Sequence, residues 1–183
     1  MHKLLRPHPD SPGLAAARVE VAVTRPRADR LVLSYMVTGQ LSDIRLAPAM
    51  PAARADGLWQ HTCFEAFVRA ASGPAYYEFN FAPSTEWAAY RFNSYRSGMA
   101  AAEIGAPAIE VRSGLDSYTL QASLELDRLP DLSREASWRL GLSALIEDIS
   151  GGKSYWALAH PPGKPDFHHA DCFALEFSPA VPS

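Results

Sequence analysis

The feature that most constrains the fold is a strict alternation of apolar and polar residues along short runs of the chain. It is clearest over Tyr118–Leu126, where each apolar residue up to Leu124 is followed by Thr, Gln, Ser or Glu. A period of two is typical of a β-strand that packs one face on a core and turns the other toward solvent. A chain that repeats such runs is expected to build sheets.

Similar apolar or alternating runs recur along the chain, separated by turn signals rich in Gly, Pro, Asn and Asp. They predict strands at Val19–Val23, Leu31–Val37, His61–Val68, Tyr76–Phe81, Trp87–Phe92, Ile109–Arg112, Tyr118–Leu126, Trp138–Asp148, Ser154–Leu158 and Cys172–Phe177. A helical turn is expected only within Asp127–Glu135. The pattern lacks the repeated long helices of an α/β fold. It predicts an all-β, antiparallel β-sandwich of about 9–11 strands with at most one short helix.

The length predicts one domain. A chain of 183 residues can be organised around a single hydrophobic core. The first 14 residues contain Pro7, Pro9 and Pro12, each of which lacks an amide donor. We therefore expect a single domain over residues 1–183 that begins with an extended arm over residues 1–14.

Composition and charge narrow the range of partners. Apolar residues make up 48% of the chain and the formal net charge is −3, with no Lys/Arg cluster. Neither nucleic acid nor a membrane is expected as a partner. Only Leu4 and Leu5 stand where a signal peptide needs a continuous apolar segment, so a cytoplasmic location is expected. Cys63 and Cys172 lie far apart and are predicted to be buried free thiols.

One predicted hairpin carries a polar face. Over His61–Val68 and Tyr76–Phe81 the alternation places Glu65, Glu78 and Asn80 opposite the aromatic residues. Arg91 of the next strand is predicted to project beside them. Burial of such groups without partners is costly, so they either pair with one another inside the protein or line a ligand cleft. Both interpretations remain open.

Four tryptophans are candidates for stacking against a sugar ring, because an indole offers a flat apolar face and one N–H donor. Trp59 and Trp87 lie beside predicted turns and are the better candidates. Trp138 begins an apolar strand and is expected in the core, whereas Trp156 fits either role.

The stretch from His160 to His169 is a second candidate region. Three prolines make it rigid, and it presents His160, Lys164, Asp166 and His168. Such a loop can preorganise ligand recognition, or it can be a crossover in which Asp166 caps backbone amides.

The spacing of histidines and cysteines along the chain supports a cofactor site or a catalytic site less than it supports ligand binding. No H-x-x-x-H or C-x-x-C pattern occurs, and no metal site is expected. No cofactor is expected, although haem held by His61 or another histidine together with Met36 or Met99 is an alternative. An enzyme would need a base such as His61 or His160 next to Glu65 or Cys63, a geometry that sequence does not show.

Several blocks of the chain carry a family resemblance. They are Asp56–Phe67, Tyr77–Ser84, Glu86–Tyr90, Ser154–Leu158 and His160–His168. Together they resemble a bacterial DOMON-like family, in the subgroup named for its association with MurB-type reductases, over nearly the whole chain. A more distant similarity is to family 9 carbohydrate-binding modules. The resemblance implies a β-sandwich whose wider superfamily binds sugars or haem, and it does not imply catalysis.

These observations lead to one functional hypothesis. The chain is expected to be a non-catalytic ligand-binding domain for a small polar ligand, a saccharide or sugar derivative, held between the polar strand face and the proline-rich loop. Haem binding and protein interaction are the alternatives. The hypothesis requires that the acidic face be reachable from outside. The candidate ligand-binding residues are Trp59, His61, Glu65, Glu78, Asn80, Trp87, Arg91, Trp156, His160, Lys164, Asp166 and His168.

Overall fold

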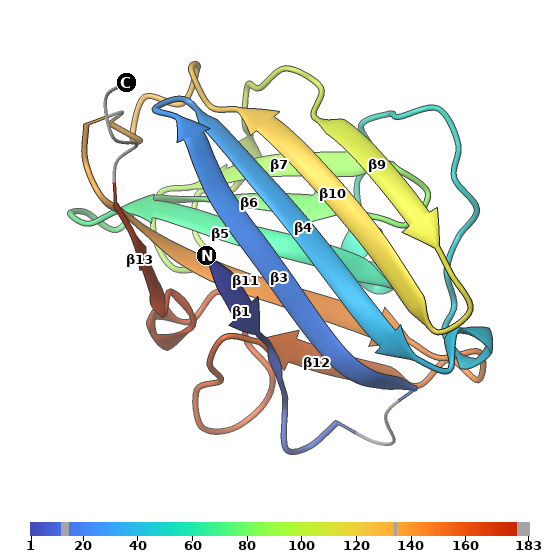
Figure 1. Cartoon of the computed structure of the whole chain (residues 1–183). Coiled ribbons are helices and arrows are strands. Elements are labelled where there is room, and N and C mark those ends of the chain that lie inside the picture. Colours follow the sequence, from blue (N-terminus) through green and yellow to red (C-terminus); the bar gives the residue numbers. More distant parts are fainter. Residues whose placement is uncertain (12–14, 134, 179–183) are drawn as a thin grey trace.

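Two antiparallel sheets pack face to face in the computed structural model, which describes residues 1–11, 15–133 and 135–178 (Figure 1). The first sheet has the order β1-β3-β4-β10-β9. Its strands are β1 (His2–Leu4), β3 (Ala16–Arg27), β4 (Arg30–Gly39), β10 (Ser117–Glu125) and β9 (Ala108–Ser113).

The second sheet has the order β2-β12-β11-β5-β6-β7-β8, and β13 pairs with β11 beside this path. Its strands are β2 (Arg6–Pro7), β12 (Lys153–Ala157), β11 (Trp138–Glu147), β5 (Cys63–Ala70), β6 (Tyr76–Phe81), β7 (Trp87–Phe92), β8 (Ala100–Ala101) and β13 (Leu175–Phe177). Every ladder between these strands is antiparallel.

The predicted all-β sandwich is confirmed. The described helices are three 3₁₀ turns, η1 (Leu41–Asp43), η2 (Leu58–Gln60) and η3 (Ala170–Cys172), and none is long and apolar enough to span a membrane. No helix forms within the described part of Asp127–Glu135, of which residue 134 lies outside the described residues. That segment instead makes turns, in which Leu129 N donates to Leu126 O at 3.2 Å.

The predicted N-terminal arm is extended and paired with both sheets. β1 pairs with β3 in the first sheet, and β2 pairs with β12 in the second. Residues 12–14 of the predicted arm lie outside the described residues.

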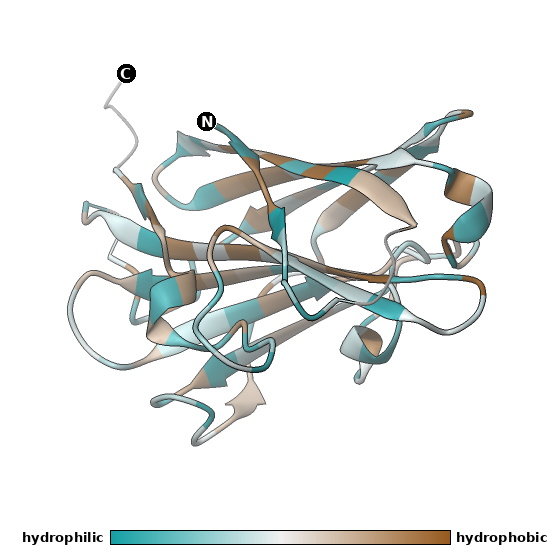
Figure 2. Ribbon diagram, turned by 90° about the horizontal axis from the view of Figure 1, so that it is seen from below, coloured by the Kyte–Doolittle hydropathy of each residue, from teal (hydrophilic) through white to brown (hydrophobic). Residues whose placement is uncertain are grey.

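The core fills the space between the sheets and takes buried apolar residues from both of them. Figure 2 shows hydrophobic stretches in the strands of both layers. The alternation predicted for Tyr118–Leu126 determines which side chains enter it: Leu120, Ala122 and Leu124 are fully buried. Cys63 and Cys172 are buried free thiols, as predicted.

The other face of the second sheet is partly covered by the segment 158–174, which connects β12 to β13. This outer face and the segment enclose a smaller aromatic cluster made by Phe67, Tyr76, Phe92, Phe167 and Phe173. Gly141 of β11 permits the close approach, since a Cβ there would lie 3.1 Å from Cys172 O. The polar residues predicted from the hairpin lie next to this cluster.

Candidate functional site

A row of polar residues crosses the outer face of the second sheet. Ser143 on β11 is opposite Glu65 on β5, which is opposite Asn80 on β6. Glu78 lies two residues from Asn80 on the same face, so it is a diagonal neighbour of Glu65. The exposed fractions are 2% for Ser143, 4% for Glu65, 0% for Asn80 and 6% for Glu78. The predicted polar face exists, but it is almost closed to solvent.

The polar row is only partly satisfied by its own hydrogen bonds. Asn80 Nδ2 donates to Glu78 Oε1 at 2.7 Å. Ser143 Oγ lies outside normal hydrogen-bond geometry, but its hydroxyl still interacts with Glu65 and acts to lower the pKa of that carboxyl. Among the described residues, none donates a hydrogen bond of normal geometry to the Glu65 carboxylate. The row therefore retains acceptor capacity.

Burial sets the charge state of the two glutamates, which we call the acid pair. Burial and the neighbouring Glu78 carboxylate raise the pKa of Glu65 well above its usual value of 4.5. Burial also raises the pKa of Glu78, against the lowering effects of the Asn80 hydrogen bond and the Arg96 charge.

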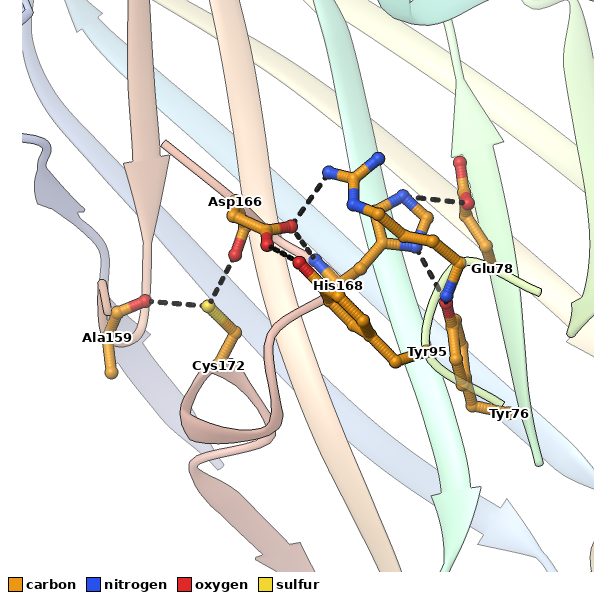
Figure 3. Close-up of polar contacts among 8 residues, drawn as sticks. Tyr76, Glu78, Tyr95, Ala159, Asp166, His168 and Cys172 are labelled. Atoms are coloured by element: carbon orange, nitrogen blue, oxygen red, sulfur yellow. Dashed lines mark hydrogen bonds and ion pairs between the residues drawn. The ribbon is translucent and has the colours of Figure 1, made fainter. Parts of the chain in front are cut away.

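The His168 ring packs on the outer face of the second sheet, beside Glu78. Its ring contacts Phe67 and Phe92 edge-on, with centroids 5.1 and 5.2 Å away. Nδ1 lies 2.8 Å from the Tyr76 hydroxyl, and Nε2 lies 3.6 Å from Glu78 Oε2 (Figure 3). Burial, together with the Arg96 charge, lowers the pKa of His168 to about 4, so this imidazole is neutral at pH 7.

Asp166 joins the proline-rich loop to the turn that follows β7. It accepts hydrogen bonds from the Tyr95 hydroxyl and from Arg96 Nη2, the latter at 2.7 Å. Although burial acts in the opposite direction, these two bonds hold the pKa of Asp166 below its usual value. Arg96 has a left-handed backbone (φ 52°), and its N–H donates to the Tyr76 hydroxyl at 3.1 Å. The turn is thereby fixed against both the loop and the sheet.

A hollow of about 450 Å³ opens between that turn and the loop, and we call it the loop hollow. Its lining residues are Tyr95, Arg96, Pro161, Pro162, Lys164, Pro165, Asp166 and His169. The Tyr95 ring is 54% exposed. Asp166 lines this hollow, and His168, two residues further along the chain, lies 3.6 Å from Glu78 Oε2. The loop hollow thus combines the apolar ring face of Tyr95, two cationic donors, Arg96 and Lys164, and the Asp166 carboxylate.

A second hollow, of about 460 Å³, lies at the end of the sheet where β5 begins, and we call it the strand-end hollow. His61 and Arg45 line it, together with Asp56, Gln60, Ser84, Glu86 and several small apolar residues. His61 Nδ1 lies 2.7 Å from Glu147 Oε2, and Arg45 Nη1 lies 3.2 Å from Glu147 Oε1. Trp59 stands in the adjoining 3₁₀ turn and is 54% exposed. No described group of three or more His, Cys, Asp or Glu side chains is arranged to hold a metal ion.

Two tryptophans have no free ring face for a ligand. Trp87 is 5% exposed and belongs to the core, with the Arg54 guanidinium 5.1 Å from its ring centre. Trp156 is also in the core, where its Nε1 donates to Ser154 Oγ at 3.0 Å. The expectation that Trp87 stacks on a sugar is wrong, because alternation along β7 turns this side chain toward the first sheet.

Arg91 and His160 also lie away from the polar row. Arg91 is opposite Tyr77, on the core-facing side of the sheet, and its Nε donates to Asp131 Oδ2 at 2.6 Å. The prediction that it joins the polar face is therefore wrong. His160 Nε2 lies 2.8 Å from Arg6 O, near the N-terminal arm. The structure does bring together Glu65, Glu78, Asn80, Asp166 and His168, and it places Lys164 on the rim of the loop hollow.

Four site residues were missed in the sequence: Tyr76, Tyr95, Arg96 and Ser143. Ser143 carried a usable signal, because it is a polar residue inside the apolar run Trp138–Asp148. Tyr95 and Arg96 follow the strand predicted at Trp87–Phe92, and only the fold shows that they face the proline-rich loop.

Comparisons with known proteins support the fold. No protein-family model and no curated protein matches the chain. A crystal structure of a "putative carbohydrate-binding protein" from Bacteroides uniformis has a TM-score of 0.70 and 14% identity, covering 97% of this chain and 84% of that one. A family 9 carbohydrate-binding module from Caldicellulosiruptor kristjanssonii, solved with glucose, has a TM-score of 0.56 and 11% identity, covering 91% of this chain and 78% of that one. The chain thus has the β-sandwich fold of these two proteins.

Proposed function

We propose that the protein is a saccharide-binding module and that the sugar binds in the loop hollow. The observation that carries the proposal is the half-exposed Tyr95 ring on the wall of a hollow that also presents Arg96, Lys164 and Asp166. A pyranose has apolar C–H faces and equatorial hydroxyls. It therefore needs an aromatic surface and nearby groups that donate and accept hydrogen bonds.

Tyr95 takes the stacking role in this proposal, and Lys164 and Arg96 donate to hydroxyl oxygens. Asp166 is held ionised by the Tyr95 hydroxyl, Arg96 and the His168 backbone N–H, and its Oδ2, which accepts only from Tyr95, can accept from a ligand hydroxyl as well. The volume of about 450 Å³ falls within the usual size of small-molecule sites, roughly 300–1,000 Å³. A mono- or disaccharide fits this space.

The fold comparisons support the same class of ligand, since one of the two similar structures is described as carbohydrate-binding and the other holds glucose. Membership of the DOMON-like family, which rests on the sequence resemblance, and a cytoplasmic location are part of this proposal. Haem binding and protein interaction stay predictions that these comparisons do not address.

Titration calorimetry with glucose, cellobiose and other small saccharides tests the proposal. Tyr95→Ala is expected to weaken binding about tenfold or more, because it removes the ring on which the sugar stacks. Tyr95→Phe keeps the ring and loses only the hydrogen bond to Asp166, so it should bind more tightly than Tyr95→Ala. Trp59→Ala is the matched control, because Trp59 is equally exposed but lies beside the strand-end hollow.

Two results would contradict the proposal. Loss of binding in Trp59→Ala with no change in Tyr95→Ala would move the site to the strand-end hollow. No heat and no change in tryptophan fluorescence with any saccharide at millimolar concentration, in protein shown to be folded, would remove the saccharide function itself.

A further inference from the structure

The charged residues that line the loop hollow do not balance. Arg96 and Lys164 bring two positive charges and Asp166 brings one negative charge, which leaves one positive charge in excess. His169 also lines the hollow, and it adds charge only when it is protonated. The whole chain, in contrast, has a net charge of −3. The loop hollow is therefore a positive site on a negative protein, and it attracts an anionic group.

Lys164 is the cation without a partner. The residue is exposed, and in the part of the chain that the structure describes its ammonium is within ion-pair distance of no carboxylate. A lone lysine on a surface has no binding role by itself, but Lys164 lines the same hollow as Arg96. Pro165 follows it with a fixed φ, and Asp166, next in the chain, is bonded to Arg96. The Lys164 ammonium therefore offers three free donors to a ligand in the hollow.

Arg96 also retains donors for a ligand. Its Nη2 donates to Asp166 Oδ1 at 2.7 Å, and its guanidinium interacts with the Tyr95 hydroxyl. A guanidinium has five N–H donors, so these two contacts do not use all of them. Burial raises the pKa of Glu65 and of Glu78, the acids beneath the hollow, so they offset less of the Arg96 charge. The Arg96 side chain is 51% exposed, and a ligand in the hollow contacts it without entering the protein interior.

The two cations lie next to the proposed stacking ring. Arg96 Cζ is 5.9 Å from the centre of the Tyr95 ring. The ion pair between Arg96 and Asp166 joins the turn after β7 to the proline-rich loop, in which Lys164 stands two residues before Asp166. A pyranose stacked on Tyr95 therefore has a cation near its edge. The exocyclic group of a pyranose lies at this edge, and in a uronic acid that group is a carboxylate.

We infer that the preferred saccharide is a uronic acid, whose carboxylate binds between Arg96 and Lys164 while its ring stacks on Tyr95. This inference rests on the proposed saccharide function and names the class of sugar. One carboxylate neutralises the excess charge, whereas a sugar phosphate carries about 1.5 to 2 negative charges at pH 7 and would leave the hollow negative beside Asp166. A planar carboxylate also matches the planar guanidinium, which can bind it through two parallel N–H donors.

Titration calorimetry at pH 7 with glucose, glucuronate and glucose 6-phosphate tests the inference. Glucuronate should bind at least about threefold and up to about tenfold more tightly than glucose, because each partly exposed ion pair contributes up to about fivefold in affinity. Raising the NaCl concentration from about 0.01 M to about 1 M should remove most of this preference and leave glucose binding nearly unchanged. Glucose 6-phosphate should bind no more tightly than glucuronate.

Two substitutions of Lys164 separate its charge from its hydrogen bonds. Lys164→Gln keeps an N–H donor, so it should weaken glucuronate binding about two- to fivefold and change glucose binding by less than about twofold. Lys164→Glu reverses the charge and should bring the affinity for glucuronate to that for glucose or below it. Lys3→Gln is the matched control, because Lys3 lies on β1 of the other sheet and should change neither affinity. Cooperative urea unfolding shows that each variant is folded.

The outcomes distinguish this inference from the proposed function. Equal affinity for glucose and glucuronate would overturn the inference and leave the saccharide function in place. A preference for glucuronate that persists in Lys164→Glu would also overturn it, because the carboxylate would then bind elsewhere, such as beside Arg45 and His61 in the strand-end hollow. Tighter binding of glucose 6-phosphate would overturn the choice of a uronic acid. Binding of none of the three sugars would contradict both proposals.

Discussion

Replacing Tyr35 by Phe tests whether a hydrogen bond from the core stabilises strand β5, which carries Glu65. Tyr35 on β4 extends across the sandwich, and its hydroxyl donates to the Glu65 carbonyl oxygen at 2.7 Å. The Tyr35 side chain is fully buried, and burial raises the pKa of its hydroxyl well above 10, so the group is a neutral donor at every working pH. Tyr35→Phe removes this donor and leaves the rest of the packing unchanged.

The expected cost follows from the geometry of the bond. A buried hydrogen bond of this length contributes about 1 kcal/mol, and a carbonyl left without that donor adds to the loss, so we expect about 1.5–2 kcal/mol. For a chain of 183 residues this corresponds to a fall in Tm of about 3–8 °C. Tyr118→Phe is the matched control. Its hydroxyl is also buried in the core but lies 3.4 Å from Pro83 O, and we expect a loss below about 0.5 kcal/mol.

Urea unfolding followed by tryptophan fluorescence measures both variants on one scale, and the slope m should not change. The reasoning fails if the two variants lose the same free energy of unfolding, or if Tyr35→Phe loses less than about 0.5 kcal/mol. Either result would mean that the Glu65 carbonyl finds another donor when the phenol is removed.

Three further predictions concern the acid pair, the thiols and the tryptophans. Since the pKa of Glu65 is raised in the folded protein, the stability linked to its proton is complete below pH 4.5 and is lost as pH rises through the folded pKa. Glu65→Gln should therefore raise the free energy of unfolding at pH 8 and leave it nearly unchanged at pH 4, and a lower value at pH 8 would contradict this. Burial raises the pKa of Cys172 to about 12 and that of Cys63 well above 9, so at pH 8 a thiol reagent should modify neither until urea unfolds the protein. Fast labelling of the native protein would refute this expectation. Trp59→Phe should remove most of the fluorescence that acrylamide quenches, because the other three tryptophans are in the core, and unchanged quenching would show that one of them is accessible.

The strands could be predicted because their alternation is local, and local pairing rules then place Glu65, Glu78 and Asn80 on one face. Strand ends were harder to predict. Pro26 lies between the strands predicted at Val19–Val23 and Leu31–Val37, but β3 continues to Arg27 because an irregularity in the β3–β4 register between Thr24 and Arg27 admits a proline.

The site was predicted less completely than the strands. β6 carries aromatic residues on both faces, so the sequence does not show which face packs on the first sheet, and this determines the roles of Trp87 and Arg91. The ion pair between Arg96 and Asp166 depends on how a turn packs against a distant loop. Such a contact between loops leaves no periodic signal in the sequence.

One edge of β11 pairs with two different strands, and this pairing bears on how the site could be redesigned. β12 pairs with residues 143–147 of this strand, and β13 pairs with residues 138–140 of the same edge. The chain therefore leaves the edge and returns to it, and the segment between must pass over the outer face. Because both ends of that segment are held by the same strand, its more exposed part, residues 162–165, can be exchanged for loops of other length and chemistry while Phe167 and His168 keep their packing. The sandwich would then serve as a scaffold on which libraries of such loops change ligand preference while the two layers stay the same.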